Sequence, residues 1–257
     1  MPVLTVLERL ARSVRAGAAL AALALAAPGA GDELLIGAAT SLRDPLEASA
    51  REFEATHPEL RLRLTYGASD VLAAQVRAGA PLDVLLSADA AIAAQLAAEG
   101  LAAEPRALAR NRLVVVAAPE IAPLRSPADL AGPAIRRIAV PEHGVPVGRY
   151  AREWLAERGL LERVAARIVP TEHARATLVA VDQGAVDAAI VYTTDARLAR
   201  HARVVWEIPD AEQPEIAYAA VVLRSTRAPL AARAYVSFLI EGPGRAHLER
   251  AGFAPPP

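Results

Sequence analysis

The sequence contains no cysteine and no lysine, and aromatic residues make up only 4% of its 257 residues. The absence of cysteine excludes disulfides, thiol nucleophiles, cysteine-bound metals and a lipid anchor on an N-terminal cysteine. We attribute the exclusive use of arginine as the basic residue to codon usage rather than to function. Because bulky aromatic side chains are few, the core has to be built mainly from Leu, Val, Ile and Ala.

Charge is nearly balanced along the chain, with a formal net charge of −1 at pH 7. The sequence shows no basic stripe and no basic patch interleaved with aromatic residues. Proteins that bind nucleic acid usually need such a basic surface to neutralise phosphates. We therefore do not expect nucleic acid to be a partner.

The first 30 residues have the pattern of an export signal. Arg9, Arg12 and Arg15 precede an uncharged run from Ala16 to Ala27, and Ala24-Leu25-Ala26 offers an A-x-A cleavage site. The apolar run is shorter than the roughly 20 residues of a membrane-spanning helix. The alternative is a buried N-terminal helix, but proline and glycine break the pattern before the first strand. We predict a signal peptide over residues 1–30 and a periplasmic or other extracytoplasmic location.

After residue 32, short apolar runs alternate with amphipathic segments. This alternation predicts an α/β protein in which helices connect mainly parallel strands. Strands are expected at 33–39, 60–66, 82–86, 112–118, 136–140, 166–170, 187–192 and 216–223, and helices at 44–56, 69–78, 89–99, 147–158, 173–184, 229–240 and 244–251.

Two proline-rich stretches, 119–133 and 209–214, interrupt this alternation. The sequence between them has the pattern of an insertion, in which the chain leaves a first lobe and later returns to it. We predict lobe 1 from residues 32–110 and 212–257, and lobe 2 from residues 111–211. Two lobes joined by paired crossings can close about a hinge, and ligands then bind where strands end and helices begin.

Serine residues occur at two consecutive strand-to-helix junctions of lobe 1. Ser41 follows the first strand and Ser69 follows the second. A helix N-terminus offers free N–H groups and a partial positive charge, so it can bind an anion without a cationic side chain. Each serine taken alone is better explained as an ordinary helix N-cap. The two together favour a shared anion site.

Several segments, in the same order, make the chain resemble the periplasmic molybdate-binding proteins that supply ABC importers. The resemblance extends from about residue 33 to residue 253. The matching segments are Ala38-Ala39-Thr40-Ser41-Leu42, Ala78-Gly79-Ala80-Pro81-Leu82-Asp83, Ser87-Ala88-Asp89, Leu113-Val114-Val115-Val116, Val145-Pro146-Val147-Gly148-Arg149-Tyr150-Ala151, Ile190-Val191-Tyr192 with Asp195, and Ala251-Gly252-Phe253.

The resemblance implies a two-lobed periplasmic-binding-protein type II fold, with mixed, mainly parallel sheets and a hinge. It implies a monomeric binding protein, not an enzyme, that has no cofactor and carries molybdate or tungstate to a membrane permease. The site it implies consists of the hydroxyls of Ser41, Ser69 and Tyr192 and the backbone N–H groups of Val147 and Ala174. Two positions depart from the family pattern: Asp70 lies beside the expected anion site, and Val147 replaces the usual alanine.

The chemistry of such a site favours a fully deprotonated oxyanion. A ligand that has only acceptors is satisfied by a site made only of donors. Hydrogen phosphate would bury an O–H without an acceptor, which costs about 1–3 kcal/mol. Sulfate also has only acceptors, so its exclusion would depend on cavity size.

Other interpretations are weaker. Two Glu-His pairs, Glu142-His143 and Glu172-His173, could bind zinc or another divalent ion, although solvent-exposed loop residues or helix-start residues explain them better. An enzyme on the same fold is an alternative, but there is no G-x-S-x-G, P-loop or G-x-G-x-x-G motif. A ligand-sensing transcription regulator would need a DNA-binding module, for which the first 30 residues are too short.

Overall fold

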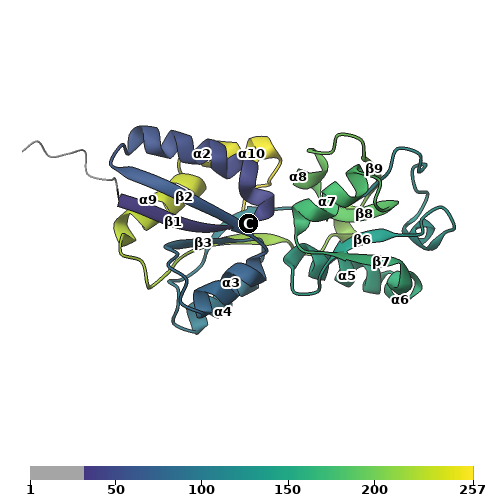
Figure 1. The fold of residues 1–257 in the computed structure, drawn as a ribbon, viewed down its shortest axis with the longest axis horizontal. Helices are drawn as coiled ribbons and strands as arrows, with labels where there is room; N and C mark the ends of the chain where they lie inside the picture. Colours follow the sequence, from purple (N-terminus) through teal and green to yellow (C-terminus); the bar gives the residue numbers. More distant parts are fainter. Residues whose placement is uncertain (1–31, 257) are drawn as a thin grey trace, which may run out of the picture. The chain divides into compact units, whose positions relative to one another are not determined.

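A computed structural model describes residues 32–256 of the protein (Figure 1). The predicted signal peptide, residues 1–30, lies outside these described residues. The described residues form one compact unit. None of the helices within the described part of the chain is both long and apolar enough to cross a membrane.

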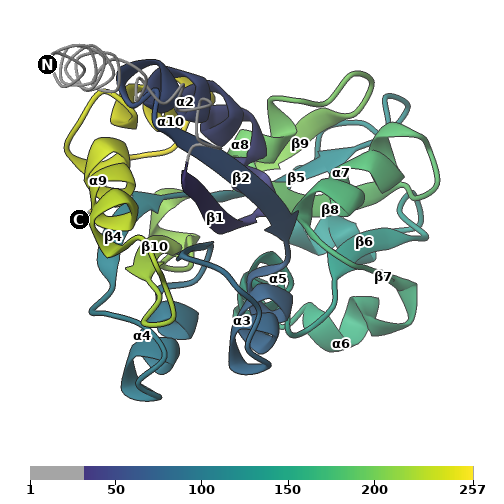
Figure 2. The same cartoon turned by 60° about the vertical axis from the view of Figure 1, so that its left-hand side comes forward.

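The first sheet has the strand order β2-β1-β3-β10-β4. Strand β1 pairs in parallel with β2 and β3, whereas β10 runs antiparallel to β3 and β4. Helices α2, α9 and α10 pack on one face of this sheet, and α3 and α4 cover the other face (Figures 1 and 2). The strands are β1 (Asp32–Ala39), β2 (Leu60–Gly67), β3 (Val84–Ser87), β4 (Arg106–Arg110) and β10 (Ala217–Val222), and the helices are α2 (Arg43–Thr56), α3 (Ser69–Arg77), α4 (Ala90–Ala98), α9 (Pro229–Ile240) and α10 (Arg245–Ala251).

The second sheet has the strand order β7-β6-β8-β5-β9. Strand β6 pairs in parallel with β7 and β8, and β5 runs antiparallel to β8 and β9. Helices α5 and α7 pack against β6 and β8 from opposite faces (Figure 1). The strands are β5 (Leu113–Ala117), β6 (Ile138–Pro141), β7 (Ile168–Thr171), β8 (Ala188–Tyr192) and β9 (Arg203–Glu207), and the helices are α5 (Pro146–Glu157), α6 (Leu161–Val164), α7 (Ala174–Asp182) and α8 (Thr193–Ala196).

Alternating side chains along the strands supply the cores on the two faces of each sheet. In the first sheet, Leu34 and Ile36 face α2 and α9, whereas Leu85 and Val221 pack with α3 and α4. In the second sheet, Val114 and several alanines and valines pack against α7. Strands that are buried on both faces are typical of sheets covered by helices on both sides. The aliphatic core predicted from the composition is confirmed.

The predicted elements match the observed ones to within a few residues, and the mixed, two-lobed α/β fold is confirmed. The sequence analysis did not predict strands β4 and β9. Both lie at the edge of their sheets and carry arginines, so neither has the continuous apolar run of a central strand. The short helices α6 and α8 were also missed, because four residues are too few to show a helical period.

All strands of the first sheet lie at 32–110 and 217–222, and all strands of the second lie at 113–207. This membership supports the proposed division into lobe 1 (32–110 and 212–257) and lobe 2 (111–211), and we keep these names below. The two crossings between the lobes are hydrogen-bonded to each other, since Asn111 N–H donates to the Ile216 carbonyl at 3.1 Å.

Candidate functional site

A small pocket is lined by residues of both lobes. Its cavity volume is about 10 Å³, close to the roughly 10–15 Å³ that one water molecule needs. Four of the five predicted site residues line it, namely Ser41, Val147, Ala174 and Tyr192. No charged side chain is among the described residues that line it. Any ligand in this pocket would therefore have to be small and would be contacted by neutral groups.

The two serines lie at the carboxyl ends of adjacent strands. Ser41 is in a 3-10 helix, η1 (Thr40–Leu42), directly after β1, and its Oγ lies 2.9 Å from the hydroxyl of Tyr218. Ser69 is the first residue of α3, after β2, and its Oγ accepts a hydrogen bond from the Ala88 N–H at 3.0 Å. Ser69 is not among the lining residues, but Ala68 and Ala88 on either side of it are.

Neither serine serves as a helix N-cap. The N-cap positions before η1 and α3 are occupied by Ala39 and Ala68, which have no capping side chain. Both serine side chains are buried, with 5% and 1% exposure. The interpretation that Ser41 and Ser69 merely cap helices is therefore wrong.

The two predicted backbone donors lie in the first turns of helices in lobe 2. Val147 is the second residue of α5, after Pro146, and Ala174 is the first residue of α7. The first N–H groups of a helix have no acceptor within that helix. A Cβ on the next residue, Gly148, would lie 2.5 Å from the Pro141 carbonyl oxygen. Glycine at this position therefore lets α5 begin directly against the end of β6.

Tyr192 ends β8 and contributes the phenolic hydroxyl that the sequence analysis predicted. Its side chain is 1% exposed, and its hydroxyl has no hydrogen-bond partner among the described residues. Burial, followed by the nearby Tyr218, raises the pKa of Tyr192 well above its ordinary value, so the hydroxyl keeps its proton. Leaving a buried hydroxyl without a partner costs about 1–3 kcal/mol. A ligand with a free acceptor would remove this cost.

Asp70, the acid next to Ser69, is not among the residues that line the pocket. Its Oδ2 lies 2.6 Å from the position that a Cβ on Gly144 would take. The carboxylate therefore faces the loop of lobe 2 that precedes α5. A side chain at 144 would require this carboxylate to shift.

Two ion pairs connect the lobes at the edges of the pocket. Asp89, the N-cap of α4, pairs with Arg149 of α5 at 2.5 Å. Asp44, in the first turn of α2, pairs with Arg175 of α7 at 2.9 Å. In both pairs the acid comes from lobe 1 and the arginine from lobe 2. Both contacts require the lobes to be close together, so they favour the closed arrangement.

Replacing Arg149 by glutamine should weaken ligand binding about fivefold. Removal of a half-buried ion pair costs on the order of 1 kcal/mol, near the upper end for exposed pairs, and here it disfavours closure. The difference should shrink as salt is added. Titration calorimetry at low and high salt measures it, with Arg63→Gln as the control, because Arg63 pairs with Glu33 within lobe 1. Equal affinities for Arg149→Gln and wild type would contradict this role.

The alternative metal residues do not form a metal site within the described part of the chain. Glu142 N–H donates to the Thr171 carbonyl at 2.9 Å, so the two Glu-His pairs follow neighbouring strands. His173 is the N-cap of α7, and its Nδ1 accepts from the Ala176 N–H at 3.0 Å. In the described region, no three His, Asp or Glu side chains, including those of His143 and Glu172, come together in a way that could hold a metal ion.

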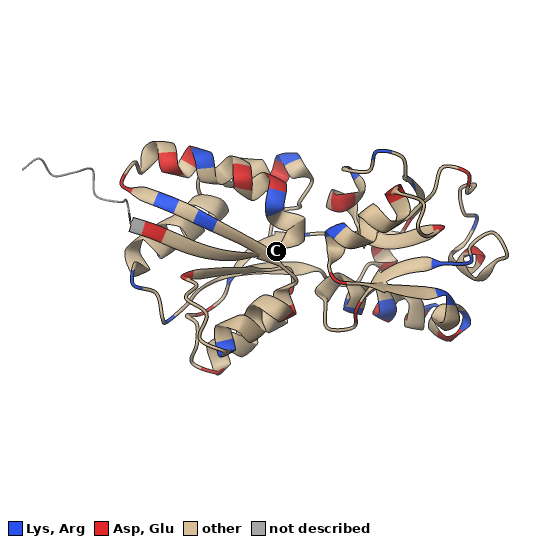
Figure 3. Cartoon of the chain, viewed as in Figure 1, with Lys and Arg blue, Asp and Glu red and all other residues tan. Residues whose placement is uncertain are grey.

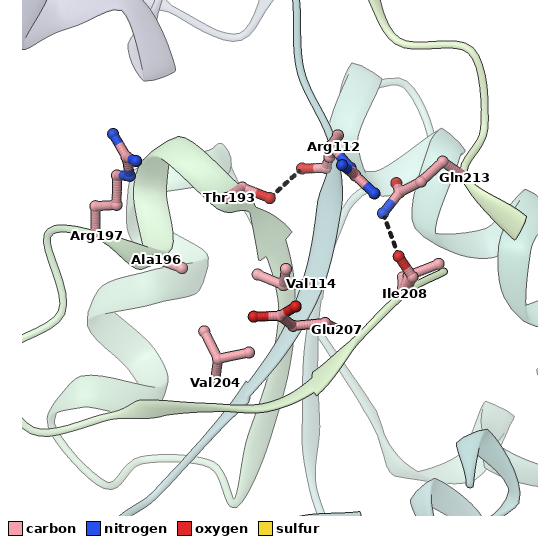
Figure 4. Close-up of a pocket in the computed structure, with 9 residues that line it drawn as sticks. All are labelled: Arg112, Val114, Thr193, Ala196, Arg197, Val204, Glu207, Ile208 and Gln213. Carbon is pink, nitrogen blue, oxygen red and sulfur yellow. Dashed lines mark hydrogen bonds between the residues drawn. The ribbon is translucent and has the colours of Figure 1, made fainter. Parts of the chain in front are cut away.

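A larger pocket lies in lobe 2 between β5, α8 and β9 (Figure 4). Arg112, Arg197 and Glu207 line it, so it carries charges of both signs. Its residues come from lobe 2 and the crossing that holds Gln213, so closure of the lobes would not complete it. Charged residues of both signs are spread over the elements of both sheets (Figure 3). This pocket is a weaker candidate for an anion than the pocket that contains Ser41.

The sequence analysis missed residues that support Ser41 through hydrogen bonds without lining the pocket. Tyr218 of β10 contacts Ser41 although 177 positions separate them, and Asn111 lies on the first crossing. The side-chain amide of Asn111 also donates to Thr194 Oγ1 at 2.9 Å. No local pattern marks these residues, because their contacts depend on the packing of the two sheets.

These features define a class of protein, the two-lobed solute-binding proteins in which a small ligand lies between the lobes. The chain belongs to the family of bacterial extracellular solute-binding proteins, whose family model matches residues 34–254. Members of this family are binding proteins. The resemblance to molybdate-binding proteins, inferred from the sequence motifs, is confirmed by the relatives described next.

The molybdate-binding protein ModA of Mycobacterium tuberculosis is 32% identical over 226 residues, which cover 87% of this chain and 85% of that protein. The structure of the periplasmic molybdate-binding protein of Azotobacter vinelandii matches with a TM-score of 0.79 and 25% identity, over 87% of this chain and all of that one. The sulfate-binding protein SubI of Mycobacterium tuberculosis has a TM-score of 0.75, with 87% and 86% of the two chains covered. At 18% identity, this last likeness shows a shared fold only.

Proposed function

We propose that the protein captures molybdate or tungstate outside the cytoplasm and delivers it to the permease of an ABC importer. The observation that carries this proposal is the small, buried pocket between the lobes, whose described lining has no charged side chain and includes the unpartnered hydroxyl of Tyr192. The names of two relatives support molybdate, since the Mycobacterium tuberculosis protein and the Azotobacter vinelandii protein are both molybdate-binding proteins.

In the proposed complex, the anion accepts hydrogen bonds from both lobes. Lobe 1 contributes the hydroxyls of Ser41 and Ser69, and lobe 2 contributes the hydroxyl of Tyr192 and the N–H groups of Val147 and Ala174. The N-termini of α5 and α7 add partial positive charge. Because only the closed state brings the two sets of donors to one anion, ligand binding shifts the population towards closure.

Sulfate is the main competing ligand, because it is also tetrahedral and has only acceptors. Hydrogen-bond donors therefore do not distinguish sulfate from molybdate. The discrimination has to come from the dimensions of the closed pocket. A divalent metal ion is disfavoured by the pocket, which offers hydrogen-bond donors rather than carboxylates or imidazoles. We further propose that the protein acts as a monomer, is not an enzyme, and is exported through the signal peptide at residues 1–30.

A thermal-shift panel with molybdate, tungstate, sulfate, phosphate and zinc tests this function. A ligand at 100 times its dissociation constant stabilises a protein by about 2.7 kcal/mol, which for this size corresponds to roughly 5–11 °C in Tm. We expect such shifts with molybdate and tungstate and little response to phosphate. A response to zinc without any response to an oxyanion would overturn the proposal.

A further inference from the structure

A buried carboxylate lies close to the lobe 2 lining of the pocket. Asp195 is in α8, which begins directly after the lining residue Tyr192, and its side chain is 0% exposed. Neither of its carboxylate oxygens has a hydrogen-bond partner among the described residues. A buried charge is costly unless it is paired and hydrogen-bonded, so the ionised form of this carboxyl is poorly stabilised where it lies.

The carboxylate belongs to a charged cluster that spans the two lobes. The Nε of Arg175, which follows the lining residue Ala174 in α7, lies 3.4 Å from Asp195 Oδ1 without a hydrogen bond. The Nη2 of the same arginine donates to Asp44 of lobe 1 at 2.9 Å. One guanidinium therefore faces two carboxylates, and its hydrogen bond goes to the one that closure brings from lobe 1.

The elements around α8 supply no second cation within the described part of the chain. Helix α8 packs against α7, β5 and β8. Strand β5 has only aliphatic side chains, and the one ionisable side chain of β8 is that of Tyr192. Tyr218 of lobe 1 is a neutral neighbour. The other charged side chains of this region are engaged elsewhere: Arg112 with Asp210, Arg197 with the Arg250 carbonyl, and Asp182 with the N–H groups of residues 200–202.

The charges on both sides of Asp195 act on its proton. Burial raises the pKa of Asp195 from 3.8 to about 6, Arg175 lowers it, and Asp44 raises it further. Because Asp44 belongs to lobe 1, closure adds to the rise. Burial also raises the pKa of Tyr192, and the Asp195 carboxylate raises it further, so its field reaches the pocket lining. A doubly negative ligand beside Tyr192 is a second like charge and favours the protonated form of Asp195 in the same way.

We propose that capture of the anion is coupled to the uptake of a proton by Asp195. This inference rests on the proposed function, because it needs a doubly negative ligand in the pocket. In the open, empty protein the carboxyl is mostly ionised at neutral pH. Closure over the ligand places it near the charges of Asp44 and of the anion, and a proton from the solvent then binds to one carboxylate oxygen. By linkage, the ligand is bound more tightly at a pH where that proton is available.

The test is titration calorimetry with molybdate at about pH 6.5. Measurements in two buffers with different ionisation enthalpies give the number of protons taken up per ligand. If the ligand raises the pKa of Asp195 by about one unit, wild type takes up about half a proton at this pH. Its affinity for molybdate should then fall about fivefold between about pH 6 and about pH 8.

Asp195→Asn should abolish this uptake and bind molybdate more tightly than wild type. The neutral amide places no charge near the ligand, so the variant should bind about tenfold more tightly at about pH 8 and about twofold more tightly at about pH 6. Asp44→Asn is a second variant that keeps the Asp195 carboxyl. It removes the acid of lobe 1 that raises the pKa of Asp195, so it should reduce the uptake.

His173→Asn is the matched control. Histidine side chains generally titrate near neutral pH, and His173 lies next to the lining residue Ala174. It caps α7 through its Nδ1, and asparagine is also a good N-cap, so the helix start should be preserved. This variant should take up as many protons as wild type.

Several results would overturn the coupling while leaving the proposed function intact. They are molybdate binding without proton uptake, uptake that persists in Asp195→Asn, uptake in Asp44→Asn equal to that of wild type, and loss of the uptake in His173→Asn. If the wild type binds neither molybdate nor tungstate, the proposed function fails and the coupling fails with it.

Discussion

A protein with Ser41→Ala and Ser69→Ala together should bind molybdate roughly 100- to 10,000-fold more weakly than wild type. Each serine would supply one hydrogen bond to a charged ligand, worth about 1.5–3 kcal/mol, and each 1.4 kcal/mol is a factor of ten in affinity. Titration calorimetry measures the change directly. At ligand concentrations that saturate wild type, the thermal shift should almost disappear.

Loss of binding has to be separated from loss of the fold. Both substitutions remove a buried hydrogen bond, that with the Tyr218 hydroxyl in one case and that with the Ala88 N–H in the other. The unliganded Tm should therefore fall as well. Ser49→Ala is a suitable control, because Ser49 is a buried serine of α2 that donates to the Leu46 carbonyl far from the pocket lining. Undiminished binding by the double variant would show that the site has been assigned to the wrong residues.

The second large effect concerns Asp195, whose replacement by asparagine should stabilise the protein at pH 8. Asp195 is 1% exposed, and neither carboxylate oxygen has a hydrogen-bond partner among the described residues. Burial raises its pKa from 3.8 to about 6, Arg175 at 3.4 Å lowers it, and Asp44 raises it further. One pKa unit corresponds to about 1.4 kcal/mol, so ionisation of this carboxyl destabilises the fold by roughly 3 kcal/mol.

The direction of the pKa shift of Asp195 determines how its effect on stability depends on pH. Because the folded protein holds this proton more tightly than the unfolded chain, stability falls as pH rises from about 3.8 to about 6. Below this window Asp195 is protonated in both states, so Asp195→Asn should differ little from wild type. Above it, the gain of Asp195→Asn should reach its full value, roughly 6–12 °C in Tm. Calorimetric unfolding at about pH 3 and at about pH 8 measures both ends.

Asp182→Asn should behave in the opposite way at pH 8. Asp182 accepts hydrogen bonds from three backbone N–H groups, those of Arg200, His201 and Ala202, and these bonds lower its pKa. Its replacement should therefore destabilise the protein where Asp195→Asn stabilises it. Destabilisation by both variants at pH 8 would contradict the account of Asp195.

The sequence predicted the fold well, because strands buried on both faces and amphipathic helices leave periodic patterns in the chain. The junction at Ser41 was visible for the same reason, since a hydroxyl after an apolar strand is a local signal. Edge strands such as β4 and β9 were not visible. Their pairing is decided by the neighbouring strand, and their own residues are partly exposed and charged.

The remaining parts of the site depend on contacts between distant segments. Tyr218 contacts Ser41, Arg149 pairs with Asp89, and neither contact has a signature in the local sequence. The direction in which Asp70 points was likewise undetermined, because a residue in the first turn of a helix can face either the solvent or the opposite lobe. Only the packing of lobe 1 against lobe 2 decides such positions.

The most direct measurement is a crystal structure of the protein grown with tungstate, using the anomalous signal of tungsten to locate the ion. The account predicts one strong peak between the lobes, within hydrogen-bond distance of the hydroxyls of Ser41, Ser69 and Tyr192 and of the N–H groups of Val147 and Ala174. A peak beside arginine side chains, such as those of Arg112 and Arg197, with the pocket between the lobes empty, would contradict it.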